Sequence, residues 1–197
     1  MPSTATSTQR KSSGGSAAKK SSASGTSRRS SSSASRGSAT NAVRVLTADH
    51  REVKRLFQQY QELVDHEAGD EEKKPLAEQI CAMLTVHATI EEEIFYPAAR
   101  EAIKDEDLVD EAAVEHASAK DLIAQIQQSE PDEELYDAKV KVLGEYIDHH
   151  VKEEEGELFP QARRAKLDLD ALGQQLLERK TELMNELGLE EGETEDR

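Results

Sequence analysis

Two segments of the sequence repeat the same arrangement of a histidine, a glutamate and a proline. They are HATIEEEIFYP at residues 87–97 and HVKEEEGELFP at residues 150–160. In each segment a glutamate follows the histidine by four residues and a proline follows it by ten. Side chains four residues apart lie on the same face of a helix. Each segment can therefore direct one imidazole and one carboxylate at a shared metal cluster.

Two further histidines, His50 and His116, fall on the inward faces of two other expected helices. A single inward histidine is more often a core residue than a ligand, but four of them on four helices form a specific pattern. Buried carboxylates among imidazoles are costly unless a cation lies between them. The sequence therefore predicts a metal site formed by His50, His87, Glu91, His116, His150 and Glu154.

A second register exists in the last of these helices, because His149 and Glu153 are also four residues apart. This register would turn Glu145 inward in place of the apolar Ile147. The alignment of the two repeats also favours the register of His150. We therefore expect His149 to lie outside the metal site.

The elements that must position these residues are helices, because Ala, Leu, Glu, Lys and Gln are abundant and aromatic residues are few. The inward face of the second helix is expected to continue through Ile94 and Ala98, and residues 66–74 are expected to form a turn. Five helices are expected. The first begins at residue 42, the second near Pro75 and the fourth at Pro131. The third covers about 108–128, and the fifth covers about 169–187. Short connections between them predict an all-α fold, an up-down antiparallel four-helix bundle with an additional C-terminal helix.

The charge is distributed unevenly along the 197 residues. Residues 1–41 hold seven basic residues and no acidic one. The rest of the chain holds the other 18 basic residues and all 41 acidic ones, which is a net charge of −23. This shift predicts three parts: a basic, serine-rich tail at 1–41, a metal-binding bundle at 42–165, and a C-terminal helix with an acidic tail at 166–197.

The N-terminal tail is expected to be disordered, because it has 15 serines and no Leu, Ile, Phe, Tyr or Trp. It lacks the apolar run of a secretory signal peptide. A transit peptide shares its composition, but the tail has no large apolar residues for an amphipathic face. No stretch approaches the roughly 20 apolar residues of a membrane-spanning helix. The single cysteine, Cys81, fits a reducing compartment, and we expect a cytoplasmic protein.

The seven cations of the tail could attract the phosphate backbone of a nucleic acid. Such contact would be weak and independent of base sequence, because the tail has no aromatic residue on which bases could stack. The alternative is a solubilising tail that contacts its own acidic domain. The sequence leaves both interpretations open.

Four segments taken together resemble the hemerythrin-like (HHE cation-binding) domain: LTADHREV, HATIEEEIFYP, EHASAKDL and HHVKEEEGELFP. The resemblance covers roughly residues 42–163. In that family a four-helix bundle holds two iron atoms between imidazoles and two bridging carboxylates. If these roles are transferred to this sequence, the resemblance implies that the four histidines are terminal ligands and that Glu91 and Glu154 bridge the two iron atoms. Ligands of this mixed type without thiolate are compatible with iron, and manganese is the other candidate.

The sequence departs from the oxygen carriers of that family at Lys120. Those carriers have a further histidine four residues after the position that His116 occupies here, and an ammonium group cannot bind a metal. The resemblance therefore implies one more open coordination position than in the carriers. His149, Tyr96 or Tyr146 could supply a replacement ligand.

Three functions follow from this comparison. The first is a non-haem diiron-binding protein, with two Fe per chain, that binds or senses O₂, NO, peroxide or iron. The second is a diiron oxidoreductase that consumes peroxide or NO, and the third is an interaction protein stabilised by its metal. No catalytic residue is assigned, because the sequence shows no acid or base beyond the expected ligands.

Overall fold

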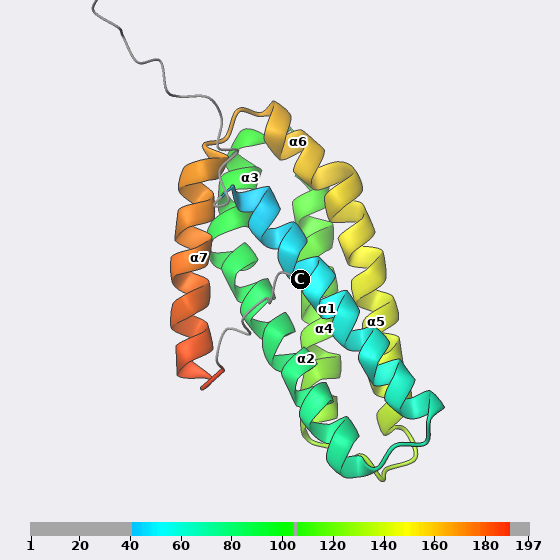
Figure 1. The fold of residues 1–197 in the computed structure, drawn as a ribbon. Coiled ribbons are helices and arrows are strands. Elements are labelled where there is room, and N and C mark those ends of the chain that lie inside the picture. The colour runs from blue at the N-terminus through cyan, green and yellow to red at the C-terminus, as the bar shows by residue number, and fades with distance from the viewer. Residues whose placement is uncertain (1–40, 105, 190–197) are drawn as a thin grey trace, which may run out of the picture. The chain divides into compact units, whose positions relative to one another are not determined.

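The computed structural model describes residues 41–104 and 106–189, and this part of the chain contains helices and no strands (Figure 1). The long helices are α1 (Ala42–Asp65), α2 (Asp70–Ile90), α4 (Asp107–Gln127), α5 (Tyr136–Glu153) and α7 (Leu169–Glu186). The short segments η1 (Glu91–Phe95) and α3 (Tyr96–Ala102) continue α2, and η2 (Glu154–Leu158) and α6 (Phe159–Arg164) continue α5. The expected all-α fold class is confirmed, whereas the tail at 1–40 lies outside the described residues.

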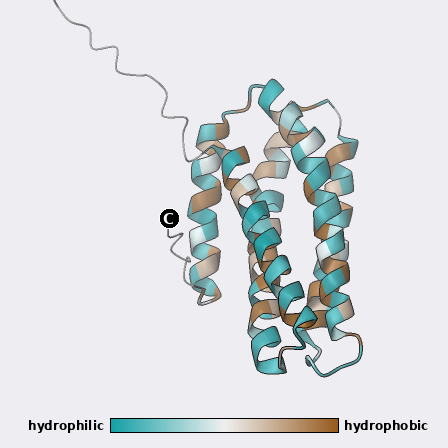
Figure 2. Ribbon diagram, turned by 45° about the vertical axis from the view of Figure 1, so that its right-hand side comes forward, coloured by the Kyte–Doolittle hydropathy of each residue, from teal (hydrophilic) through white to brown (hydrophobic). Residues whose placement is uncertain are grey.

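Four of the long helices form the bundle that the sequence predicts. Helix α1 packs against α2 and α5, and α4 packs against the same two helices. The additional helix α7 packs against α1, α2 and η1 (Figure 1). The long helices carry hydrophilic and hydrophobic residues together, as expected for helices with one buried face (Figure 2). No helix among the described residues has the length and apolar character needed to cross a bilayer. The domain boundaries at 41/42 and 165/166 stay predictions.

The core consists of two apolar clusters with a polar layer between them. On every bundle helix the buried histidine falls between residues of one cluster and residues of the other. The first cluster includes Leu46, Ile90, Phe95, Val109 and Phe159. The second cluster includes Val53, Leu84, Ala119, Ile123 and Leu143. The bundle therefore encloses the predicted metal site between two apolar clusters.

Helices α2 and α5 each widen into a π-helical turn at the predicted glutamate ligand, Glu91 or Glu154. Both turns precede a proline, whose ring would clash with the carbonyl four residues earlier in a regular α-helix. A π-turn holds more residues than an α-turn, so it shifts the inward face that follows it. The prediction that Ile94 and Ala98 continue the inward face is therefore wrong. Their neighbours, Phe95 and Ala99, are the fully buried residues.

Two predicted helix starts also differ from the structure. Helix α2 begins at Asp70 rather than near Pro75, because three acidic residues favour the positive end of the helix dipole. The turn expected at 66–74 is correspondingly shorter. Helix α5 begins at Tyr136 rather than at Pro131. Here Glu130 and Glu133 close a separate turn, in which the backbone N–H of Glu130 donates to the Glu133 carboxylate (2.9 Å).

Candidate metal centre

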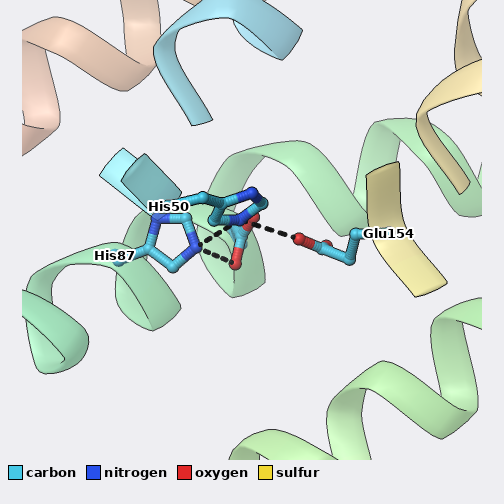
Figure 3. Close-up of side chains that lie close together, drawn as sticks. His50, His87 and Glu154 are labelled. Carbon is cyan, nitrogen blue, oxygen red and sulfur yellow. Dashed lines mark hydrogen bonds and ion pairs between the residues drawn. The ribbon is translucent and has the colours of Figure 1, made fainter. Parts of the chain in front are cut away.

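The structure brings all six predicted residues together in the polar layer of the bundle. Each of them is buried. The Nε2 atoms of His50 and His87 lie 3.2 Å apart, and those of His116 and His150 lie 3.1 Å apart. Figure 3 shows His50, His87 and Glu154 directed toward one another. The imidazoles thus form two pairs, each with its Nε2 atoms close enough to share one cation.

The two buried carboxylates lie between these pairs. Oε2 of Glu154 is 3.2 Å from Nε2 of His50 and 3.6 Å from Nε2 of His150. Oε2 of Glu91 is 3.2 Å from Nε2 of His87 and 3.5 Å from Nε2 of His116. Each carboxylate therefore reaches one imidazole of each pair, which is the arrangement needed to bridge two cations.

These two carboxylates accept fewer hydrogen bonds from the protein than their oxygens can accept. Oε1 of Glu91 and Oε2 of Glu154 are buried and have no hydrogen-bond partner. Burial and the nearby charge of Glu154 raise the pKa of Glu91 well above its usual range. Leaving such groups without partners costs free energy, and cations between them would remove that cost. The donor set and its unpaired atoms fit a site for metal cations.

A second set of carboxylates faces the outer nitrogen, Nδ1, of every histidine in the site. The facing carboxylates are Asp49 for His87 (3.5 Å), Glu92 for His116 (3.0 Å), Glu115 for His150 (2.7 Å) and Glu155 for His50 (2.9 Å). A carboxylate on the outer nitrogen orients an imidazole and directs its other nitrogen at a metal. The histidines are therefore held as metal ligands usually are.

Sequence reasoning missed these four carboxylates, although each lies beside a predicted ligand in the chain. Asp49 precedes His50, and Glu92 follows Glu91. Likewise, Glu115 precedes His116 in α4, and Glu155 follows Glu154 in η2. Adjacency was the available signal, but every one of these carboxylates contacts a histidine on a different helix. Only the packing of the helices shows which acid serves which imidazole.

Burial and charge set the protonation of the histidines. Burial lowers the pKa of His87. Burial together with the charge of His150 lowers the pKa of His116 to about 4. Burial opposes the charged form of His50 as well, but contacts with Glu154 and Glu155 outweigh it and raise that pKa. His87 and His116 are therefore neutral near pH 7, which is the form that binds a metal.

The structure separates the three candidates for a replacement ligand. The hydroxyl of Tyr96 donates to Oε1 of Glu154 (2.9 Å) and lies 3.2 Å from Nε2 of His116, so it belongs to the site. Tyr146 is exposed. The side chain of His149 is 63% exposed, and it pairs with Glu115 and Glu153 outside the polar layer.

Lys120 does not direct its ammonium group at the buried carboxylates. Its Nζ donates to both carboxylate oxygens of Glu92, at 2.7 and 2.6 Å. Because Glu92 also contacts His116, the lysine holds that carboxylate against the imidazole. Lys120 therefore contacts His116 only indirectly, through the carboxylate of Glu92.

A small cavity of about 20 Å³ adjoins all four histidines. Its remaining walls are mainly apolar, and include Val53, Leu84, Ala119, Ile123, Ile147 and Val151. A cavity of this size holds about one water molecule or one diatomic molecule. A groove of about 590 Å³ between α1 and α5 shares His50, Ile147 and Val151 with the cavity. These three residues separate the metal site from the groove.

Comparisons with known proteins agree with this geometry. The chain is 32% identical over 123 residues to a DNA nickase from Nostoc sp., matching 62% of this chain and 34% of that protein. It therefore spans about a third of that relative's length. A solved hemerythrin HHE cation binding domain-containing protein from Mycobacterium kansasii has the same fold, with a TM-score of 0.63 and 24% identity over 74% of this chain and 88% of that one. Residues 41–162 match the family model of the hemerythrin HHE cation binding domain, and the chain belongs to this family of metal-cation-binding proteins.

Proposed function

We propose that this protein is a non-haem diiron protein that binds O₂, NO or peroxide at its buried centre. The observation that carries the proposal is the arrangement of two imidazole pairs joined by two carboxylates. Imidazole and carboxylate ligands without a thiolate suit iron. When bound, the two irons supply the redox chemistry and the open positions at which a small molecule can bind.

The residues of this chain have distinct roles in the proposal. His50 and His87 would hold one iron, and His116 and His150 would hold the other. Glu91 and Glu154 would supply carboxylate ligands to both, since each carboxylate reaches both imidazole pairs. The four outer carboxylates keep the imidazoles in the orientation that metal binding needs.

Tyr96 completes the site on the side of Glu154 and His116. Its hydroxyl hydrogen bond to Glu154 fixes the orientation of that carboxylate. No further histidine is available beside His116, because Lys120 occupies its place and turns to Glu92. The adjoining cavity would hold a small molecule beside the irons, and its mainly apolar walls would exclude bulk water.

Metal analysis combined with visible spectroscopy tests the proposal. We expect about two irons per chain, as in other bundles with dinuclear carboxylate sites. The visible spectrum is expected to change when the anaerobically reduced protein meets air or NO. A protein that retains zinc and excludes iron, or an iron-loaded protein whose spectrum is unchanged by both gases, would contradict the proposal.

The cavity beside the histidines also favours a second candidate, an oxidoreductase that consumes peroxide or NO. It places a small reactant next to both imidazole pairs. A turnover assay with peroxide on the iron-loaded protein separates an enzyme from a binding protein. An interaction protein that uses iron only for stability would bind no small molecule at the iron, so ligand titration identifies the third function.

Acidification is expected to release the iron. The ligating imidazoles must be neutral, and protons compete with the metal for them, so affinity falls as the pH falls. We expect the loss to begin as His50, whose pKa is raised, becomes charged, and to be complete near pH 4, where His116 gains its proton. Iron retained after desalting across a pH series measures the effect. Full retention well below this range would indicate a site held mainly by carboxylates.

A nucleic-acid contact through residues 1–41 is a separate proposal, and the name of the Nostoc relative, DNA nickase, gives it support. A chain that begins at Asn41 is expected to bind DNA more weakly than the full chain at low salt. If all seven cations of the tail contacted phosphates, the log–log salt slope would be at most about −6. Equal binding by both chains would exclude the tail as a DNA-binding element, and the iron content should be equal in both.

A further inference from the structure

Helix α7 lies outside the residues matched by the family model, 41–162, yet it contacts the metal centre through one lysine. Nζ of Lys180 donates to Oδ1 of Asp49 at 2.6 Å. The side chains are 18% and 8% exposed, respectively, so the ion pair is largely removed from water. An ion pair in such surroundings is poorly screened and holds its geometry more firmly than a surface pair.

The other oxygen of Asp49 faces a predicted metal ligand. Oδ2 lies 3.5 Å from Nδ1 of His87, and both atoms are buried and have no hydrogen-bond partner. One carboxylate is therefore shared between the ammonium of α7 and the imidazole of α2. If Lys180 were absent, Asp49 would be a buried charge free to turn away from the imidazole.

We infer that Lys180 is a positioning residue for His87 and acts through Asp49. The inference rests on the proposed role of His87 as a metal ligand. Lys180 fixes one oxygen of Asp49, which directs the other at Nδ1 of His87. The ring is then held with Nε2 toward Glu91 and His50, where the metal binds.

Helix α7 is anchored well enough to perform this role. Leu176 is fully buried and Met184 nearly so. The neighbouring Arg179 pairs with Glu93 of η1 (2.8 Å), which ties α7 to the bundle at a second point. Among the other outer carboxylates, Glu92 is held from within residues 41–162, by Lys120. Asp49 differs because its cation comes from the added helix.

The rate at which a chelator removes iron from the loaded full-length protein tests the inference. Loss of an outer-shell partner typically weakens metal binding by about 10–100-fold. We expect Lys180→Met to release iron about 10-fold faster or more, and Lys180→Arg to restore most of the retention because it keeps the cation. Arg179→Met is the matched control: it removes a neighbouring ion pair of α7 and should leave the release rate and visible spectrum unchanged.

A double variant distinguishes positioning from general stabilisation of α7. If Lys180 acts through Asp49, then Asp49→Asn should release iron as fast as Asp49→Asn combined with Lys180→Met. The double variant also removes the unpaired buried charge, so it serves if Lys180→Met alone folds poorly. Three results would each overturn the inference. The wild type and Lys180→Met could release iron at the same rate, or Lys180→Met and Arg179→Met could speed the release equally. In the third, the effects of Asp49→Asn and Lys180→Met on the release rate would add in the double variant. A wild-type protein that binds no iron would instead overturn the proposed function.

Discussion

Replacing His150 with alanine is expected to remove most of the bound iron, whereas replacing its neighbour His149 should leave the iron content nearly unchanged. His150 is buried, with Nε2 3.1 Å from that of His116 and Nδ1 2.7 Å from Glu115. The alanine variant loses a ligand and leaves Glu115 without its buried partner. His149 instead lies mostly in solvent, where ion pairs contribute roughly 0–1 kcal/mol.

Iron per chain, measured by elemental analysis after loading, gives the comparison. The two variants differ by one sequence position and remove the same side chain, so each controls for the other. Circular dichroism of both metal-free proteins shows whether a loss of iron reflects a loss of fold. An empty site in His149→Ala together with a full site in His150→Ala would mean that the outer register, with Glu153, binds the metal.

Replacing Glu91 with glutamine is expected to have opposite effects on metal binding and on stability. The amide cannot bridge two irons as a carboxylate does, so iron retention should fall sharply. The metal-free protein should become more stable near neutral pH. Burial and the charge of Glu154 raise the pKa of Glu91, so its ionised form is costly in the folded state. We expect the gain to reach about 1.4 kcal/mol for each pH unit above the ordinary glutamate pKa, up to the raised pKa of Glu91.

The pH dependence of this gain has a definite sign. With its pKa raised in the folded state, Glu91 keeps its proton at pH values where the unfolded chain has lost it. The contribution of Glu91 to the stability of the metal-free wild type therefore falls as the pH rises above the ordinary glutamate range toward the raised pKa. Glutamine does not titrate, so the difference in stability between the two metal-free proteins should be small near pH 4 and grow toward pH 8.

Urea unfolding of the chelator-treated proteins at several pH values measures the difference. Glu157→Gln is the matched control, because Glu157 is an exposed glutamate of the other π-turn, η2. Its substitution should change neither iron retention nor the pH dependence. A Glu91→Gln protein that is less stable than the wild type at pH 8 would show that Glu91 is not held at a cost in the metal-free fold.

The sequence by itself identified the fold class and brought the six central residues of the site into one hypothesis. It could do so because helical periodicity is local: a histidine and a glutamate four residues apart share a face whatever surrounds them. The repeat of that pair before a proline also selected His150 over His149. The buried position of His150 and the exposed one of His149 agree with that choice.

Other features of the site depended on contacts that no local pattern encodes. The π-turn at Glu91 shifts the inward face by one residue, so periodicity extrapolated past it selects Ile94 and Ala98 in place of the buried Phe95 and Ala99. Tyr96 could not be separated from His149 and Tyr146 as an additional group of the site until its hydroxyl was seen beside Glu154. Its place depends on how two helices pack.

The outer carboxylates and the added helix required the tertiary structure most. Asp49 stands beside His50 in the chain but serves His87, and its cation, Lys180, lies 131 residues away. Neighbours in sequence share a helix and point to different sides of it, so adjacency does not say which partner a side chain contacts. That choice was made by the packing of α1, α2 and α7, which brings three distant side chains together away from water.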